Sequence, residues 1–375
     1  MKRNPRLIAV VAAVAAVGTI GAVGASMALT APQPAVPMTP PVISRDVALG
    51  PDGRLSVQFV GDTMLGDAAQ PLIDQKGYDW PLQAARDSLV GDFAIAVAES
   101  PITTLTLPWS IDKEYSYSTR PEAAGALARA GIDAMTMANN HVFDVGPVGL
   151  INTISNLEAA GVSAFGAGPD IERAEQPLLL RSELGTLAVV GMGESFGTRA
   201  GPDEPGTVEF SSEAIARGAE TARLAGADWV IANVHWGDNY QPINAEQRHW
   251  AQQFAEAAYD MVVGSGSHSA QPIEFIGSMP VVYSVGNFVF GSPGRFDDIR
   301  VPPIGLAVGV ELSAEGPAQL SIRCLQSDND VVGFQPQPCT PSEAQANLPA
   351  LHADLTVHGD VGVIPCGCFA RRAGE

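Results

Sequence analysis

The chain is short of basic residues for its length. It has 21 lysines and arginines against 41 aspartates and glutamates in 375 residues, a formal net charge of −20. Three of the basic residues come before residue 7, so the chain from residue 31 carries 18 basic and 41 acidic residues, a net charge of −23. A surface of this sign repels nucleic acid and anionic lipid. We therefore expect no nucleic-acid partner, and a polyanionic ligand would need a local basic patch or metal ions.

Cysteine is also scarce, and its four residues all lie late, at Cys324, Cys339, Cys366 and Cys368. No histidine or further cysteine stands near Cys366 and Cys368 at zinc-finger spacing, so a disulfide role is favoured over metal binding. An exported protein can oxidise such residues. A Cys324–Cys339 bridge would close a plausible loop, although the spacing leaves the connectivity open.

A long hydrophobic run follows the basic residues at the N-terminus. Leu7–Leu29 is 23 residues long, which is enough to span a bilayer as a helix. A cleaved signal peptide would look similar, because the run ends in the small residues of Gly24–Ala28. We favour an uncleaved anchor, since the run is long for a signal-peptide core. The expected location is the cell membrane, single-pass with an extracytoplasmic domain; the alternative is secretion after cleavage.

Composition divides the chain into four segments. They are an anchor or signal peptide at 1–30, a proline-rich linker at 31–50, a folded domain at 51–325 and a cysteine-containing tail at 326–375. Glycine and proline follow no period, which excludes a collagen-like protein.

Strand-like and helix-like patterns alternate within the folded domain. The expected strands include Leu55–Asp62, Phe93–Glu99, Ile132–Ala138 and Leu187–Gly193, with another from Asp228. The expected helices are Pro121–Gly131, Pro147–Ala160, Ser212–Ala225 and Asn244–Tyr259. This alternation predicts an α/β fold whose sheets are covered by helices.

Several of these strands end in carboxylate, amide or imidazole side chains. The residues are Asp62, Glu99, Asn140, His141, His235 and His268. Ligands of α/β proteins bind beyond the carboxyl ends of strands, so we expect this set to converge. Oxygen and imidazole ligands suit Mn, Fe, Zn or Mg, and two such ions can clamp a phosphoryl group during hydrolysis.

Each candidate also has a structural interpretation. Asp62 would serve as a turn or cap residue, Glu99 as a surface carboxylate, and His235 and His268 as ordinary structural histidines. Asn139 would bond the backbone of its own loop. Asp144 would cap the next helix or, functionally, orient His141.

The ordered segments GDTMLGD, ESPIT, ANNHVFDVGPVGL, NVHWGDNY, HSAQPIE and YSVGNFVF resemble the CapA family over about Leu55 to Phe290. These are poly-gamma-glutamate capsule synthesis proteins of the calcineurin-like metallophosphatase superfamily. The resemblance implies a metallophosphatase-like four-layer sandwich, two mixed β-sheets flanked by helices. It also implies one or two divalent ions.

The same resemblance implies a role for each matching residue. Asp62, Glu99, Asn140, His235 and His268 match metal ligands, with Glu99 as the bridging carboxylate, while His141 matches the acid and Asp144 the aspartate that follows it.

Three positions depart from the family or from the wider phosphatases. Val97 replaces an amide, Gly266 replaces the first histidine of the closing motif, and Met64 stands where other phosphatases have a ligand histidine. The loss at Gly266 leaves a single ion, completed by water, as an alternative to two.

Two functions follow from these expectations. The first is an exported, membrane-anchored metal-dependent hydrolase or transferase of cell-envelope or capsule polymer synthesis. Its substrate would be an envelope polymer or a phosphoester, and its partners the cytoplasmic membrane and membrane polymer synthase subunits. The second is a degenerate, non-catalytic assembly or anchoring component of a synthase complex.

Overall fold

The computed structural model describes residues 42–44, 53–194, 197–293, 296, 301–313 and 318–369. The expected N-terminal anchor and most of the expected linker lie outside these residues. In the described ranges, no helix is both long and apolar enough to cross a bilayer. The membrane anchor therefore stays a prediction.

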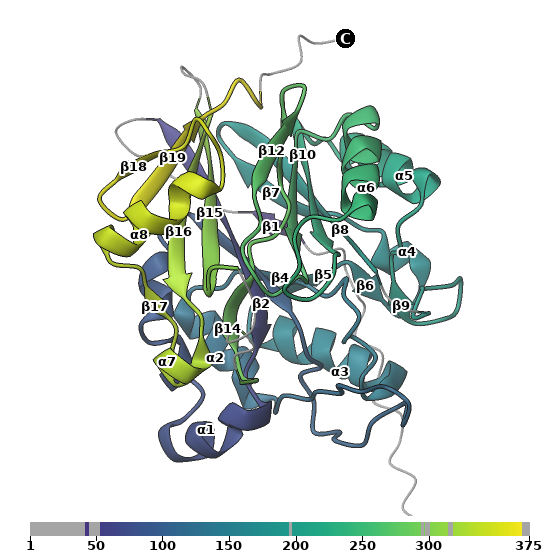
Figure 1. Cartoon of the computed structure of the whole chain (residues 1–375). Coiled ribbons are helices and arrows are strands. Elements are labelled where there is room, and N and C mark those ends of the chain that lie inside the picture. Colours follow the sequence, from purple (N-terminus) through teal and green to yellow (C-terminus); the bar gives the residue numbers. More distant parts are fainter. Residues whose placement is uncertain are drawn as a thin grey trace, which may run out of the picture. The chain divides into compact units, whose positions relative to one another are not determined.

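The described strands form two large mixed sheets (Figure 1). The seven-stranded sheet has the order β1 (Val42–Ser44), β7 (Leu178–Ser182), β8 (Gly185–Gly193), β10 (Trp229–His235), β11 (Met261–Ser265), β13 (Met279–Val282) and β12 (Ile273–Ile276). The ten-stranded sheet runs through β18 (Thr356–His358), β19 (Val361–Pro365), β16 (Gln319–Gln326), β15 (Ile304–Ser313), β2 (Arg54–Met64), β3 (Phe93–Ala98), β4 (Ala134–Thr136) and β5 (Ser163–Phe165), with β14 (Asn287–Phe290) on β2 and β17 (Gln337–Pro338) on β16. A small pair, β6 (Ala167–Gly168) and β9 (Gly206–Thr207), lies apart from both.

Each sheet has a parallel centre with antiparallel strands added to it. In the ten-stranded sheet β2, β3, β4 and β5 are parallel, and β15 pairs with β2 in the antiparallel sense. In the seven-stranded sheet β8, β10, β11 and β13 are parallel, while β7 is antiparallel to β8 and β12 is antiparallel to β13. The edge strand β1 is parallel to β7. Parallel neighbours bring their carboxyl ends to the same edge of a sheet, which is where the polar residues were expected to meet.

Helices cover the sheets (Figure 1). They are α1 (Gln70–Lys76), α2 (Glu122–Ala130), α3 (Gly146–Ala159), α4 (Ile171–Ala174), α5 (Ser212–Leu224), α6 (Ala245–Glu256), α7 (Asn329–Val332) and α8 (Pro341–Asn347), with 3-10 turns at Asp67–Ala69, Trp80–Leu82, Ala85–Ser88 and Leu348–Ala350. Helices α5 and α6 contact β8, β10 and β12, and α3 contacts β5. The predicted fold class, an α/β sandwich of two mixed sheets flanked by helices, is confirmed.

Strand β8 shows how one sequence supplies two hydrophobic layers. Leu187 and Val189 are buried in the core between the two sheets, together with Phe59 of β2. The alternate residues Ala188 and Val190 are buried on the opposite face, in the cluster that includes Phe254 of α6. A strand covered on both faces reads as a nearly continuous apolar run, as this one does.

The predicted helices are found with small shifts at their ends. The expected helix at Asn244–Tyr259 is observed as α6, and Asn244 is its N-cap: its side chain accepts from the Gln247 N–H, and the Gln247 side chain accepts from the Asn244 N–H. The helix ends at Glu256, and Ala258 adopts a left-handed φ of 60°. The strand expected at Ile132–Ala138 is limited to β4, because the chain turns directly after it, with the Asn139 N–H bonded to the Met137 carbonyl.

The cysteines lie on the C-terminal side of the ten-stranded sheet. Disulfides join Cys324 to Cys339 and Cys366 to Cys368. The boundary expected at residue 325 falls within β16, and β19 from the expected tail pairs along β16.

Gly61 lies directly before Asp62, the first candidate ligand, where the backbones of two segments approach closely. A Cβ at this position would lie 1.7 Å from the Gly286 carbonyl oxygen, which also accepts the Asp62 N–H at 3.1 Å. Because the obstacle is backbone, we expect Gly61→Ala to lower the free energy of unfolding by about 2 kcal/mol or more. The measurement is urea unfolding followed by circular dichroism.

Gly125→Ala is the matched control. It lies within α2, where an added Cβ meets only the end of the Arg129 side chain. Alanine is the better helix former, so stability should stay constant or rise by up to about 1 kcal/mol. Equal unfolding midpoints for the two variants would contradict the close approach at Gly61.

Candidate metal centre

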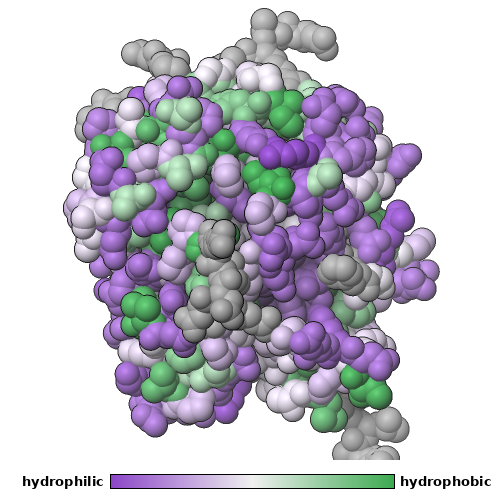
Figure 2. Space-filling model, viewed as in Figure 1, coloured by the Kyte–Doolittle hydropathy of each residue, from purple (hydrophilic) through white to green (hydrophobic). Residues whose placement is uncertain are grey.

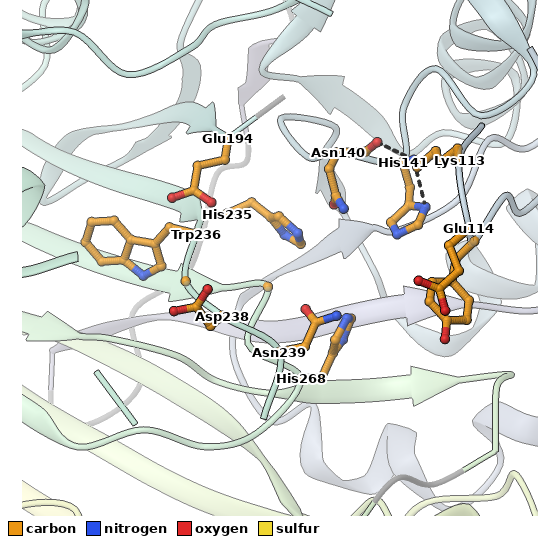
Figure 3. A pocket seen from close by; sticks show the side chains of 13 residues that line it. Lys113, Glu114, Asn140, His141, Glu194, His235, Trp236, Asp238, Asn239 and His268 are labelled. Atoms are coloured by element: carbon orange, nitrogen blue, oxygen red, sulfur yellow. Dashed lines mark hydrogen bonds between the residues drawn. The ribbon is translucent and has the colours of Figure 1, made fainter. Parts of the chain in front are cut away.

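The predicted site residues converge at the carboxyl ends of strands from both sheets. Asp62 lies in β2, Glu99 follows β3, and Asn140 and His141 follow β4. His235 ends β10, and His268 follows β11. Figure 3 shows Asn140, His141, His235 and His268 around one pocket. The topology therefore brings all six strand-end residues together.

Three of these residues form a compact group of potential ligands. The ligand atoms of Asp62, Glu99 and His235 all lie within 4.8 Å of one another. The His235 Nδ1 is 3.7 Å from the Asp62 Oδ1 and 3.6 Å from the Glu99 Oε2. Asp62 and Glu99 are completely buried, with 0% exposure each. This spacing suits ligands that share one cation.

Several oxygen atoms in and beside this group have no hydrogen-bond partner. Asp62 Oδ1, both carboxylate oxygens of Glu99 and Asn140 Oδ1 are buried without a hydrogen-bond partner. A buried charge without a partner is strongly disfavoured. Oxygen ligands with an adjacent imidazole are a donor set that Mn, Zn, Fe and Mg accept. The residues present therefore fit a divalent metal ion.

The pKa directions reflect the same crowding of charge. Burial raises the pKa of Glu99 well above its usual range, and the neighbouring Asp62 and Asp144 raise it further. Burial alone would raise the pKa of Asp62, but a hydrogen bond from His268 and the nearness of His268 and His235 lower it overall. Burial lowers the pKa of His235 to about 4, so its ring is neutral at neutral pH and can offer a lone pair.

His268 contacts Asp62 through the other carboxylate oxygen than the one nearest His235. Its Nδ1 is 2.9 Å from the Asn287 Oδ1 and 3.2 Å from the Asp62 Oδ2. Its ring packs against Phe290, with centroids 5.0 Å apart. The Asn287 contact fixes the orientation of the ring. His268 thus steadies Asp62 directly and stands beside the ligand group.

His141 forms a dyad with Asp144. The His141 Nδ1 is 2.7 Å from the Asp144 Oδ2, and the His141 Nε2 is 3.9 Å from the Glu99 Oε1. An ionised carboxylate only accepts, so Nδ1 donates and Nε2 is directed at the ligand group. Burial lowers the pKa of His141, while Asp144 acts in the opposite direction. Asp144 therefore lies where it orients His141, which was its predicted functional role.

The loop after β4 is held by Asn139. Its side-chain amide donates to the Ala98 carbonyl at 2.8 Å, and its Oδ1 accepts the His141 N–H at 2.9 Å. The structural interpretation of Asn139 is confirmed, because both ends of its side chain bond backbone.

Gly266 stands at the position where the resemblance led us to expect the first histidine of the closing motif. Its φ is +98°, and a Cβ would lie 3.0 Å from two atoms of the His235 ring. Its N–H donates to the Asp62 Oδ2 at 3.2 Å. A histidine at this position would need His235 and the backbone to move, so the peptide group contacts Asp62 in its place.

The other two departures are buried. Val97 is 0% and Met64 1% exposed, and Val97 pairs with Asp62 in the register of β2 and β3. Neither residue lines the pocket.

Lys113 is the main site residue that sequence patterns did not reveal. Its Nζ donates to the Asn140 carbonyl at 2.6 Å and to Asp144, and lies 3.3 Å from the His141 Nδ1 (Figure 3). It comes from a segment without strand or helix periodicity. The available signal was rarity, because the chain has only three lysines, at Lys2, Lys76 and Lys113.

The pocket in front of these residues has a volume of about 420 Å³. Its wall includes the acidic residues Glu114, Glu194 and Asp238, along with Lys113. Burial, together with the nearby Glu246, raises the pKa of Glu194 to about 7. The wall is thus mainly acidic, with one ammonium group beside His141.

Comparison with known proteins agrees with the motifs. Residues 56–292 match the family described as bacterial capsule synthesis protein PGA_cap. The PGA biosynthesis protein CapA of Bacillus subtilis is 30% identical over 249 residues, 64% of this chain and 64% of that protein. The capsule biosynthesis protein CapA of Bacillus anthracis is 26% identical over 246 residues, 63% of this chain and 60% of that protein. The chain thus spans less than two thirds of each relative.

Solved structures resemble the chain at lower identity. A calcineurin-like phosphoesterase, YfkN of Bacillus subtilis, aligns with 72% of this chain and 88% of its own, at 14% identity and a TM-score of 0.41. The family match extends over most of the chain and includes every strand-end residue described above. The chain therefore belongs to the bacterial capsule synthesis protein family PGA_cap.

Proposed function

We propose that this protein is a metal-dependent hydrolase or transferase of capsule or cell-envelope polymer synthesis, of the poly-gamma-glutamate type. The observation that carries the proposal is the set of four buried oxygens of Asp62, Glu99 and Asn140 that have no partner and stand beside His235. The printed names of the Bacillus relatives, in PGA and capsule biosynthesis, supply the polymer context.

The proposed location is the outer face of the cytoplasmic membrane. Leu7–Leu29 would anchor the chain, and the proline-rich residues that follow would tether the domain at the outer surface of the bilayer, next to polymer synthase subunits. The substrate would be a phosphoester or the envelope polymer itself.

Asp62, Glu99, Asn140 and His235 would hold the ion, with His268 steadying Asp62. When bound, a divalent metal supplies Lewis-acid polarisation of a phosphoryl or carbonyl oxygen and favours attack by water.

The chain's own contribution is proton transfer and orientation. His141, protonated on both ring nitrogens, would give its Nε2 proton to the leaving oxygen, while its Nδ1–H keeps donating a hydrogen bond to Asp144. Lys113 holds Asp144 and the Asn140 carbonyl and so keeps the dyad directed at the pocket.

A second candidate function is a non-catalytic assembly component. Gly266 favours it, because this position offers a backbone N–H where the family motif has a ligand histidine. Such a protein would retain the fold and its partners without turnover.

Metal binding is the first test. We expect the wild-type protein to bind Mn²⁺ or Zn²⁺ in a calorimetric titration, and Asp62→Ala to weaken that binding by at least about tenfold. Removing a residue that only supports a ligand already weakens metal affinity by about tenfold or more, and removing a ligand should weaken it further. Asp74→Ala is the control, because Asp74 is an exposed partner of Arg120. A wild-type protein that takes up neither metal would exclude the proposed enzyme.

Glu99 gives a pH-dependent prediction. Because its pKa is raised in the folded protein, the folded state binds the proton more tightly than the unfolded chain does. Its contribution to stability is present below the unfolded pKa of about 4.5 and is lost as the pH rises above that value. With a metal chelator present, the change in unfolding temperature between pH 5 and pH 7.5 should therefore be larger for the wild type than for Glu99→Gln. Identical pH dependence in both proteins would contradict the buried, unpaired state of Glu99.

His141 separates the two candidate functions. His141→Ala should keep metal binding within about twofold but reduce hydrolysis by roughly 100-fold or more, the usual contribution of a general acid. A phosphoester and peptide substrate screen and the cellular polymer yield are the measurements. A stably folded variant that leaves polymer yield unchanged would favour the assembly component.

A further inference from the structure

The segment between β3 and α2 exposes an unusual run of large apolar side chains. In residues 104–118, called here the rim loop, Leu107 is 83%, Trp109 67% and Ile111 94% exposed. Leu105 and Tyr115 are 38% and 37% exposed. No charged residue occurs from Leu105 to Ile111. The face of the molecule in Figure 2 is mostly hydrophilic, with hydrophobic residues in small groups.

The rim loop is fixed at its ends and in its middle. The Thr103 N–H bonds the Thr119 carbonyl and the Thr119 N–H bonds the Pro101 carbonyl, both at 2.8 Å. The Trp109 N–H donates to the Asp144 carbonyl at 2.8 Å. The Trp109 ring lies against Gly146, where an added Cβ would be 2.5 Å from a ring atom. The apolar side chains are thus held outward by a defined backbone.

The two sides of the rim loop differ in character. Lys113, Glu114 and Tyr115 line the pocket, and Lys113 bonds the His141–Asp144 dyad. Leu107 and Ile111 project into solvent, and Trp109 is 67% exposed with one part of its ring against Gly146. The loop therefore connects the wall of the site with an outward apolar surface.

We propose that the rim loop inserts Leu107, Trp109 and Ile111 into the outer leaflet of the membrane, so that the pocket opens at the bilayer surface. The inference rests on the anchoring that is part of the proposed function. It implies a substrate presented at the membrane, such as a lipid-linked phosphoester or a polymer emerging from its synthase.

The length of chain before the domain supports the bilayer as the occupant. Twelve residues separate Leu29, the end of the apolar run, from Val42 in β1. A fully extended chain covers at most about 3.6 Å per residue, so the start of the domain lies within roughly 40 Å of the bilayer. An anchored domain is therefore kept close enough for a surface loop to meet lipid.

The charge of the protein and the exposure of the loop also favour the bilayer as the surface that the rim loop contacts. The strong negative charge of the protein opposes binding through anionic headgroups, whereas an uncharged run with a tryptophan suits the apolar and interfacial layers. Leu107 and Ile111 are 83% and 94% exposed, so almost all of their apolar surface is available to contact lipid.

The test uses the full chain reconstituted into phosphatidylcholine vesicles. Trp109 can be monitored selectively, because Trp229 and Trp236 are buried and Trp80 and Trp250 are partly buried. The difference in emission between wild type and Trp109→Phe reports Trp109. We expect this signal to shift to shorter wavelength, to be quenched by brominated lipid and to be shielded from aqueous iodide.

Two variants sharpen the result. Leu107→Ser combined with Ile111→Ser should restore iodide quenching of Trp109 and abolish quenching by brominated lipid. Leu224→Ser removes an equally exposed leucine, 83% exposed at the end of α5, and should change neither signal.

The remaining outcomes overturn the proposal in distinguishable ways. If the chain floats with the vesicles while Trp109 stays open to iodide, anchoring stands and the loop proposal fails. Shielding from iodide without quenching by brominated lipid would mean that the loop docks on protein, including a second copy of this chain. A chain that does not float with the vesicles would refute both the anchoring and the loop proposal.

Discussion

The burial of two neighbouring carboxylates, Asp62 and Glu99, is the constraint around which this domain is organised. Both lie at the seam where strands of the two sheets end, out of reach of water. The first is held by a peptide N–H and a histidine, and the second has no hydrogen-bond partner in the described structure. Burying such a pair is costly unless a cation or a proton neutralises it, and the His235 ring does not contribute positive charge because burial keeps it neutral. The arrangement therefore favours binding of a cation.

The distribution of charge around the pocket adds a second condition. The wall carries Glu114, Glu194 and Asp238, and Lys113 is already bonded to Asp144. An anionic substrate would thus be repelled by most of the wall and attracted only near the ligand group.

Much of the site was readable from the sequence, because it consists of short polar motifs placed directly after apolar strands. The rule that parallel strands present their carboxyl ends together groups Asp62, Glu99, Asn140 and His141 at one sheet and His235 and His268 at the other. The packing of the two sheets, which the rule does not describe, brings the two sets together. The start of a helix was also predictable from the sequence where a capping residue marks it, as Asn244 does for α6.

The contacts that were missed depend on tertiary structure. Lys113 reaches the dyad from a loop without periodicity, and Asn287 meets His268 because β14 pairs with β2. The strand pattern also overestimated β4 at both ends, since an apolar residue such as Met137 can be buried in a turn as easily as in a sheet. Local sequence carries little information on such long-range pairings.

Gly266 limits which residues this position of the site accepts. Its contact with Asp62 is made by the peptide group, so substitution at this position leaves the donor in place while introducing a Cβ against the His235 ring. The φ of +98° adds a backbone penalty for any residue with a side chain. The floor of the site is therefore adapted to a residue without a Cβ, and a side chain at this position would require the His235 ring to shift.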